Sequence, residues 1–412
     1  MKKELIEKYA ELVVKTGVNV QKNQLVVINA NIVAKEFVEE LTEKAYLAGA
    51  SKVKVNWSDE ALQKMKFQYQ SNETISDIRD YLYAEALDDN ERGACFIHVL
   101  SDNPDNLKDV DSAKVALQMS SYFKNPLASK IMNYTMANIN QWCVVGYPSN
   151  EWAQKVFPNE TAKNANNLLS KAILKTARIT SRNNPVKELE KHNRKLHANF
   201  VKMNKLNFKS LHYTNSLGTD IEIGLPKHHV WAGGAELSQS GIKYAPNIPS
   251  EEIFTAPDKL QVNGIVYASM PLAYNGSVIK DLWIKVKDGK IIDFGAKENQ
   301  NVLAKLLDTD SGSHYLGEVA LVPYDSPISN SGILFFNTLY DENASCHLAI
   351  GRGYPMCIKN GEKMTEEECE NAGVNFSNTH VDFMVGTKDL QIIGTKYDGQ
   401  KVTVFKEGNF AI

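Results

Sequence analysis

The sequence lacks the features that mark several common protein classes. None of the five cysteines belongs to a C-x-x-C pair, which argues against a disulfide framework and against a structural zinc site. No stretch approaches the roughly 20 consecutive apolar residues of a membrane-spanning helix, and the first residues carry charges where a signal peptide is apolar. The net charge of −3 gives no electrostatic case for nucleic acid or an anionic membrane. We therefore expect a cytoplasmic protein that binds neither nucleic acid nor a membrane.

Several catalytic motifs are absent as well. The sequence has no H-E-x-x-H, no G-x-S-x-G and no Walker loop, so zincin, α/β-hydrolase and P-loop chemistry lose their usual support. The loop after the first predicted strand, residues 30–33, has no G-x-G-x-x-G to approach a pyrophosphate. We expect the N-terminal half to shape or support a site rather than to bind a dinucleotide.

Two domains are expected because 412 residues exceed the length at which a single core keeps growing. In the first half, strand patterns at 24–29, 52–56, 94–99 and 142–145 alternate with helical periodicity, which predicts parallel strands joined by right-handed crossovers. A polar, turn-rich stretch at 180–185 is typical of a linker. We predict an α/β N-terminal domain with a parallel sheet at 1–182, followed by a β-rich α+β metal-binding catalytic domain at 186–412.

The second half consists of short strand patterns and tight turns. The strand candidates are 208–213, 220–224, 264–268, 282–287, 291–294, 333–336, 381–385 and 391–393. The dipeptides Asn275-Gly276 and Asp288-Gly289 are typical of two-residue hairpin turns.

Candidate metal ligands stand in four short segments of this half. They are Glu252, Glu318, Glu342, His347, His380 and Asp382. Four carboxylates and two imidazoles are more ligands than one four-coordinate zinc uses. They suit two borderline metals that share a carboxylate, polarise a carbonyl and make hydroxide at neutral pH.

The His-Val-Asp sequence at 380–382 is the most informative of these segments. Residues two apart on a strand project from the same face, so imidazole and carboxylate converge. A His–Asp hydrogen bond at a strand end is the alternative for this pair alone, but a buried Asp is costly without a partner. Glu318 opens an apolar run and calls for a cation, with Lys305 and His314 the only basic residues nearby in sequence.

Glu342 and His347 belong to an Asp-Glu-Asn loop that leads into an apolar strand, a natural place for oxygen ligands. Taken alone, acidic residues in a loop are usually solvated. Cys346 adjoins His347, but on a strand it points to the opposite face. We therefore expect Cys346 to be a small buried residue rather than a nucleophile.

Glu251 and Glu252 lie in a loop bracketed by prolines, where one carboxylate could ligate while the other works as general acid/base. The first turn of a helix is the alternative structure for this segment. Tyr354, on a glycine-flanked loop, is either a donor to a developing oxyanion or a packing residue.

Together these segments resemble the metallo-aminopeptidase family represented by aminopeptidase T, aminopeptidase S and aminopeptidase II. The likeness covers essentially the whole chain and is most specific in residues 247–257, 341–347 and 378–386. It implies an exopeptidase acting on peptides with a free N-terminus, with two divalent metal ions per chain. The ions are zinc or cobalt, with manganese or magnesium as alternatives. It also implies a homodimer.

The resemblance further implies that all six candidate residues are ligands, with Glu318 as the bridge and Tyr354 as the active-site tyrosine. The spacing favours Glu252 as the ligand, which leaves Glu251 as the acid/base candidate. From the residues alone, two other functions stay open: a small-ligand binding protein with structural metals, and another dinuclear metallohydrolase such as a phosphoesterase. The latter needs basic residues near the metals, and Arg352 is the only close candidate.

Overall fold

The computed structural model describes residues 1–412, and the chain forms two compact units. The first unit comprises 1–193 and 235–249, and the second comprises 194–234 and 250–412. The chain therefore passes between the units inside helix α10 (Pro185–Leu206) and returns once to the first unit. The expected boundary at 182–186 precedes the first passage, whereas the return of 235–249 has no signal in the sequence. The division into 1–182 and 186–412 stays a prediction about segments that fold on their own.

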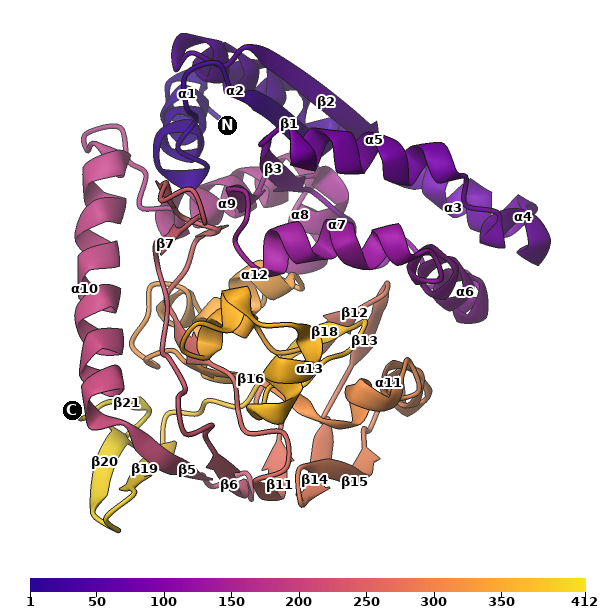
Figure 1. Ribbon diagram of the computed structural model, residues 1–412. Coiled ribbons are helices and arrows are strands. Elements are labelled where there is room, and N and C mark those ends of the chain that lie inside the picture. Colours follow the sequence, from indigo (N-terminus) through magenta and orange to yellow (C-terminus); the bar gives the residue numbers. More distant parts are fainter. The chain divides into compact units, whose positions relative to one another are not determined.

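A five-stranded parallel sheet forms the centre of the first unit, in the order β2-β1-β3-β4-β9. Figure 1 labels β2, β1 and β3 of this sheet. Its strands are β1 (Leu25–Asn31), β2 (Lys52–Ser58), β3 (Cys95–Leu100), β4 (Trp142–Gly146) and β9 (Asn247–Ile248), with a small β7 (Glu236–Leu237) and β8 (Lys243–Tyr244) pair beside them. The helices are α1 (Lys3–Leu12), α2 (Lys35–Leu47), α3 (Glu60–Tyr69), α4 (Asn72–Ser76), α5 (Asp80–Glu91), α6 (Ser112–Phe123), α7 (Pro126–Met136), α8 (Asn150–Val156) and α9 (Ala162–Thr176). The four predicted strands and their parallel pairing are confirmed.

One face of this sheet carries a row of polar side chains. Asn29 of β1 lies directly between Asn56 of β2 and His98 of β3. Asn56 Nδ2 donates to Asn29 Oδ1 at 2.9 Å, and Asn29 Nδ2 lies 3.3 Å from His98 Nδ1. All three groups are uncharged when His98 is neutral, and burial lowers the pKa of His98 to about 4.

The second unit is built on two antiparallel sheets. The larger has the order β15-β14-β11-β6-β5-β19-β20-β21 and the smaller has the order β10-β16-β17-β18. The larger sheet contains β5 (Phe208–Thr214), β6 (Asp220–Gly224), β11 (Val262–Tyr267), β14 (Trp283–Lys287), β15 (Lys290–Gly295), β19 (Gln391–Lys396), β20 (Lys401–Lys406) and β21 (Asn409–Phe410). The smaller contains β10 (Ile253–Thr255), β16 (Leu316–Leu321), β17 (His347–Gly351) and β18 (His380–Met384).

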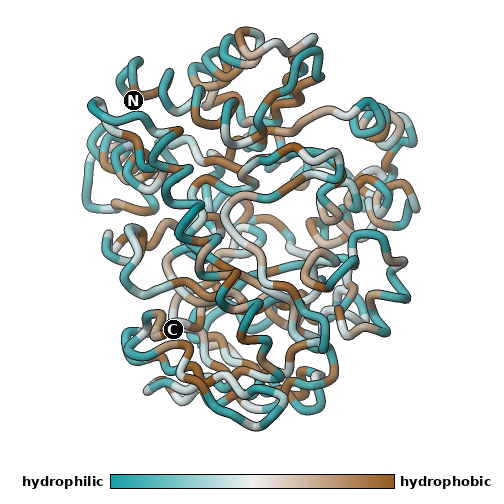
Figure 2. Tube along the Cα trace, turned by 60° about the vertical axis from the view of Figure 1, so that its left-hand side comes forward, coloured by the Kyte–Doolittle hydropathy of each residue, from teal (hydrophilic) through white to brown (hydrophobic).

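Three short helices and one hairpin complete this unit: α11 (Gln300–Leu307), α12 (Thr338–Asp341), α13 (Glu366–Asn371), and β12 (Leu272–Tyr274) with β13 (Ser277–Ile279). Apolar residues of both sheets and of α11 share one hydrophobic core. Polar and apolar residues alternate along much of the chain, as one-sided burial requires (Figure 2). The predicted fold class, a parallel α/β region followed by a β-rich region, is confirmed.

Both predicted hairpin turns are present, and their residues have the left-handed φ of this turn type: 48° and 70° at Asn275-Gly276, and 48° and 81° at Asp288-Gly289. The strand predicted at 333–336 is wrong, because the segment has no strand structure. Phe335 and Asn337 donate their backbone N–H groups to the Asp341 carboxylate. The Asp341 carboxylate thus accepts backbone N–H groups that would pair with a neighbouring strand if this segment were a strand.

None of the helices combines the length and apolar character needed to cross a membrane.

Candidate metal centre

The smaller antiparallel sheet places the candidate ligands on one face through its register. Glu318 of β16 lies opposite Ala349 of β17, and Ala349 lies opposite Asp382 of β18. His347 and His380 are two residues from members of this row, so they project from the same face. Glu252 directly precedes β10, which pairs with β16 at the edge of the sheet. The opposite face carries core residues such as Val319, Leu348 and Phe383.

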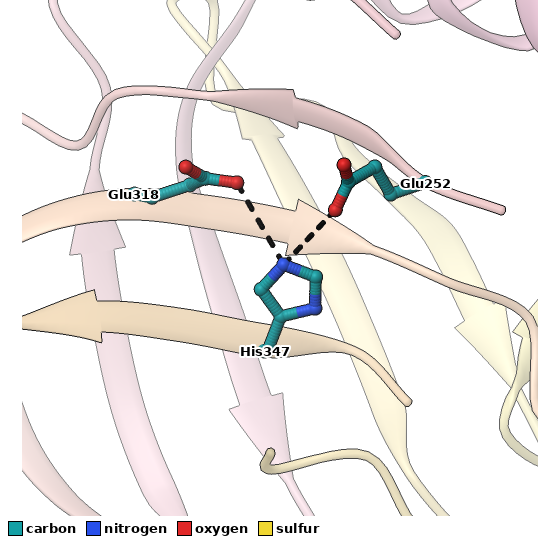
Figure 3. Close-up of side chains that lie close together, drawn as sticks. All are labelled: Glu252, Glu318 and His347. Atoms are coloured by element: carbon teal, nitrogen blue, oxygen red, sulfur yellow. Dashed lines mark ion pairs between the residues drawn. The ribbon is translucent and has the colours of Figure 1, made fainter. Parts of the chain in front are cut away.

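Glu318 is the centre of the cluster because its two oxygens face different histidines. His347 Nε2 lies 3.1 Å from Glu252 Oε2 and 3.7 Å from Glu318 Oε1, as Figure 3 shows. His380 Nε2 lies 3.3 Å from Glu318 Oε2 and 3.4 Å from Asp382 Oδ1. Two groups of possible ligands therefore share one carboxylate: Glu252, Glu318 and His347, and Glu318, His380 and Asp382.

Backbone carbonyls orient both imidazole rings. His347 Nδ1 lies 2.9 Å from the carbonyl of Glu342 and 3.0 Å from that of Ser345. His380 Nδ1 lies 2.7 Å from the carbonyl of Arg352. A carbonyl only accepts, so each Nδ1 carries a hydrogen, and Nε2 is the ring nitrogen that faces the carboxylates and is available to a metal ion. This is the arrangement of metal-ligating histidines, whose second nitrogen is held by an outer partner.

The cluster concentrates negative charge in a buried place. Burial raises the pKa of Glu252, and burial followed by repulsion from Asp382 and Glu252 raises that of Glu342 well above its ordinary value. Burial would lower the pKa of His347, but hydrogen bonds with Glu252 and Glu318 raise it well above the usual range. Four ionised carboxylates with two imidazolium partners would carry an excess negative charge, which is costly in a protein interior, so the cluster favours bound protons or a cation.

At His380 and Asp382, burial and the attraction between the two charges have opposing effects on each pKa. Burial opposes both charges, but the attraction between them raises the pKa of His380 and lowers that of Asp382. The Oδ1 atom of Asp382 is nevertheless buried without a close hydrogen bond, since His380 Nε2 lies 3.4 Å away. A lone pair left in this position, beside oriented imidazoles, fits a divalent cation with N and O ligands.

Small residues lie on the same face of the sheet as the candidate ligands. Ala320 lies opposite His347, and Ala349 separates Glu318 from Asp382; both are fully buried. Gly317, at a register shift just before Glu318, approaches the Arg352 carbonyl so closely that an added Cβ would lie 2.2 Å from its oxygen. That carbonyl is the one that orients His380, so the absence of a side chain at Gly317 permits this contact.

The Asp-Glu-Asn segment divides between structure and site. Glu342 is buried and lies outside the two close groups, although its charge interacts with those of Asp382 and Glu252. Asp341, considered above as part of an oxygen-rich ligand loop, accepts the N–H groups of Phe335 and Asn337 instead. Burial raises its pKa to about 7, and these hydrogen bonds oppose the rise.

Tyr354 and Glu251 border the cluster. The Tyr354 ring meets the His380 ring edge-on with centroids 5.1 Å apart, and it lies 5.7 Å from the Phe254 ring. Burial, followed by repulsion from Glu318 and Asp382, raises the pKa of Tyr354 well above its ordinary value, so the phenol stays protonated. Glu251 is buried, and its backbone N–H donates to Asn343 Oδ1 at 2.6 Å.

Cys346 is confirmed as a buried structural residue. Its Sγ contacts the backbone of Val322, accepting from the N–H at 3.4 Å and donating to the carbonyl at 3.3 Å. Burial raises the pKa of the thiol to about 12, which opposes nucleophilic chemistry.

Some supporting residues have no signal in the sequence. The carbonyls of Ser345 and Arg352 act through the backbone, which any residue type would supply. Asn343 was visible only as a neighbour of Glu342, because its other two side-chain partners, the N–H of Glu251 and the carbonyl of Leu339, belong to the backbone.

Comparisons with known proteins agree over the full length. The chain matches the family described as Thermophilic metalloprotease (M29) over residues 2–410. It is 42% identical to aminopeptidase AmpS of Bacillus subtilis over 403 residues, covering 98% of this chain and 97% of that protein. Aminopeptidase 2 of Geobacillus stearothermophilus is likewise 42% identical, over 98% of this chain and 97% of the relative.

Solved structures give the same result. The structure of wild-type AmpT from Thermus thermophilus matches with a TM-score of 0.90 at 34% identity, covering 100% of both chains. A 2,5-dihydroxypyridine dioxygenase from Pseudomonas putida KT2440 matches with a TM-score of 0.53 at 11% identity, which is a likeness of fold alone. With a family match over nearly every residue and relatives above 30% identity along the whole chain, this protein belongs to the M29 family of thermophilic metalloproteases.

Proposed function

We propose that the chain removes N-terminal residues from peptides with a free N-terminus, at a dinuclear metal centre held by Glu252, Glu318, Glu342, His347, His380 and Asp382. Its family makes it a metallo-aminopeptidase; the number of ions, their ligands and the catalytic residues are the proposal. The observation that carries it is Glu318, whose two oxygens face His347 and His380 separately. A shared carboxylate of this kind is what a pair of metal sites requires.

Each residue has a role that its surroundings support. Two divalent cations, zinc or cobalt with manganese or magnesium as alternatives, would polarise the substrate carbonyl and supply hydroxide near neutral pH. Tyr354, kept protonated by its surroundings, would donate to the oxyanion that develops on the carbonyl. Glu251 would carry the proton to the leaving amine. Neighbouring carboxylates would hold the substrate's α-ammonium group, which accounts for cleavage at the N-terminus.

Two rival functions receive less support from the structure. Structural zinc sites are closed, four-coordinate and rich in cysteine, whereas here Cys346 bonds to the backbone of Val322. A phosphoesterase would need a free cation near the metals. Arg352, the closest candidate, donates to Glu366 at 3.0 Å and lies over the Phe376 ring at 4.7 Å, so its charge is already engaged.

Hydrolysis of leucine p-nitroanilide tests the reaction class. We expect turnover that a chelator abolishes, that added zinc or cobalt restores, and that disappears when the substrate is N-acetylated. Chelator-resistant turnover, or equal turnover of the acetylated substrate, would contradict the proposal.

Two further parts of the proposal rest on other grounds. A homodimer follows from the family resemblance, and sedimentation equilibrium of the full chain would measure it. We also propose a cytoplasmic location, which fractionation of the source cells would test.

A further inference from the structure

Asn343 is a fully buried side chain that joins two ligand-bearing segments. Its Oδ1 accepts the backbone N–H of Glu251 at 2.6 Å. Its Nδ2 donates to the Leu339 carbonyl at 2.9 Å and lies 3.3 Å from Glu342 Oε1. An N–H can only donate and a carbonyl can only accept, so these partners define the orientation of the amide.

Each of the two segments it joins leads to one residue of the Glu252–Glu318–His347 group. Glu251 precedes Glu252, and the turn at 342–344 leads into His347, whose ring is oriented by the carbonyls of Glu342 and Ser345. Glu252 and His347 are the pair at 3.1 Å. Asn343 makes no hydrogen bond to His380 or Asp382. The orientation of the His380 ring depends on the carbonyl of Arg352.

From these contacts we infer that Asn343 is a positioning residue that selectively sets the metal affinity of the Glu252–Glu318–His347 group. This inference rests on the proposed dinuclear centre. Without the amide, the Glu251–Glu252 segment loses this hydrogen bond to the turn at 342–344, so the distance between Glu252 and His347 is less tightly constrained. The Glu318–His380–Asp382 group keeps all its supports. Outer partners of metal ligands are worth about 10-fold to 100-fold in metal affinity.

The test is a calorimetric titration of the metal-stripped full chain with Co²⁺. We expect the unsubstituted protein to bind two equivalents. Asn343→Ala should bind one equivalent unchanged and the other about 10-fold to 100-fold more weakly. Asp382→Asn weakens the Glu318–His380–Asp382 group and is used to assign the affected position. This single variant should bind one equivalent tightly, in the Glu252–Glu318–His347 group. The double variant with Asn343→Ala should bind that equivalent more weakly as well.

Asn204→Ala is the matched control. The Asn204 side-chain amide also hydrogen-bonds to backbone groups of a distant segment. It donates to the Trp231 carbonyl at 3.0 Å and accepts from the Trp231 N–H at 2.8 Å, and neither partner is a proposed ligand. It should lower thermal stability and leave both metal constants unchanged. Asn343→Ser, which keeps a small polar group, serves as a milder second variant.

The outcomes separate the two proposals. Fewer than two equivalents in the unsubstituted protein would overturn the dinuclear centre itself. Two equivalents there, with unchanged constants in Asn343→Ala or equal weakening of both positions, would overturn the inference about Asn343 alone. Loss of the fold in both Asn343 variants, seen by circular dichroism of the metal-free chains, would also overturn it, because Asn343 would then be a general core residue.

Discussion

Histidines occur among polar neighbours in both the five-stranded and the four-stranded sheet, with opposite electrostatic results. In the first unit, His98 lies beside neutral amides, and burial lowers its pKa to about 4. In the second, His347 and His380 are also affected by burial, yet the nearby carboxylates of Glu252, Glu318 and Asp382 raise their pKa values well above the usual range. Burial alone therefore does not mark a metal site. Neighbouring amides satisfy one another by hydrogen bonds, whereas clustered carboxylates leave negative charge that bound protons or a cation must neutralise.

The largest expected effect comes from removing the shared carboxylate. Glu318→Gln keeps the size of the side chain but removes the charge that both histidines face, so metal should be lost from both groups. We expect kcat/KM for leucine p-nitroanilide to fall at least about 10³-fold, since metal assistance is worth several kcal/mol. Metal content should fall in parallel. Glu367→Gln, on the exposed first turn of α13, is the control. Full metal occupancy in Glu318→Gln would contradict the proposal that the charge of Glu318 is needed for metal binding in the four-stranded sheet.

Metal removal should make the charged sheet unstable in a pH-dependent way. Glu252, Glu342, His347 and His380 all have raised pKa values in the folded chain. Their contribution to stability is therefore greatest below the unfolded values, 4.5 for Glu and 6.5 for His, and is lost as pH rises through the folded values. Asp382, with a lowered pKa, acts in the opposite direction.

We therefore expect the metal-free chain to melt at lower temperature as pH rises from about 5 to 8, with the fall beginning near the ordinary Glu value. Each ion at 100 times its Kd should restore about 2.7 kcal/mol. Calorimetric scans with and without chelator at each pH would measure this. A metal-free chain that is as stable at pH 8 as at pH 5 would show that the buried charge is neutralised in some other way.

Tyr354→Phe sharpens the comparison by separating chemistry from charge. The phenol is not among the proposed ligands, so both ions should stay bound while kcat falls about 100-fold through loss of an oxyanion donor. Metal analysis and steady-state kinetics give the two readouts. Unchanged kcat would return Tyr354 to the role of a packing residue against Phe254 and His380.

The smallest effect is expected in the neutral row. His98→Gln keeps an acceptor for Asn29 and should cost about 1 kcal/mol of unfolding free energy at pH 7, with unchanged metal content. The lowered pKa means that His98 stabilises the fold above its unfolded value of 6.5 and that this contribution is lost as pH falls toward 4. The variant should therefore show a shallower acid limb in urea unfolding. An NMR titration of His98 with a midpoint above 6 would contradict the neutral assignment.

Much of the framework was predictable because its signals are local. Short apolar runs predicted the parallel strands β1, β2, β3 and β4, and the two-residue spacing of His380 and Asp382 predicted a shared face. The strand predicted at 333–336 was wrong because Asp341 captures the backbone N–H groups of that segment. Whether a carboxylate or a neighbouring strand accepts these N–H groups depends on the three-dimensional structure. The periodicity of apolar residues gives no information about it.

The supporting residues were unpredictable for a related reason. Asn343 acts by joining Glu251 to the turn at 342–344, and those groups are about ninety positions apart in the chain. The return of 235–249 to the first unit likewise depends on pairing of the two-residue strand β9 with β4, which is too short for a pattern. Residue type indicated which groups were chemically able to ligate, but not which neighbours hold them.

The alanine between Glu318 and Asp382 also has an evolutionary consequence. Ala349 is fully buried and lies between the two carboxylates in register, so its methyl group limits how much space remains above the sheet. A larger apolar residue there, as in Ala349→Val, would occupy that space with a side chain type that is common in β-strands. A descendant chain could thus keep its fold and lose its chemistry through one hydrophobic substitution that touches none of the ligands. Among relatives, the residue at this position should distinguish working enzymes from inactive ones.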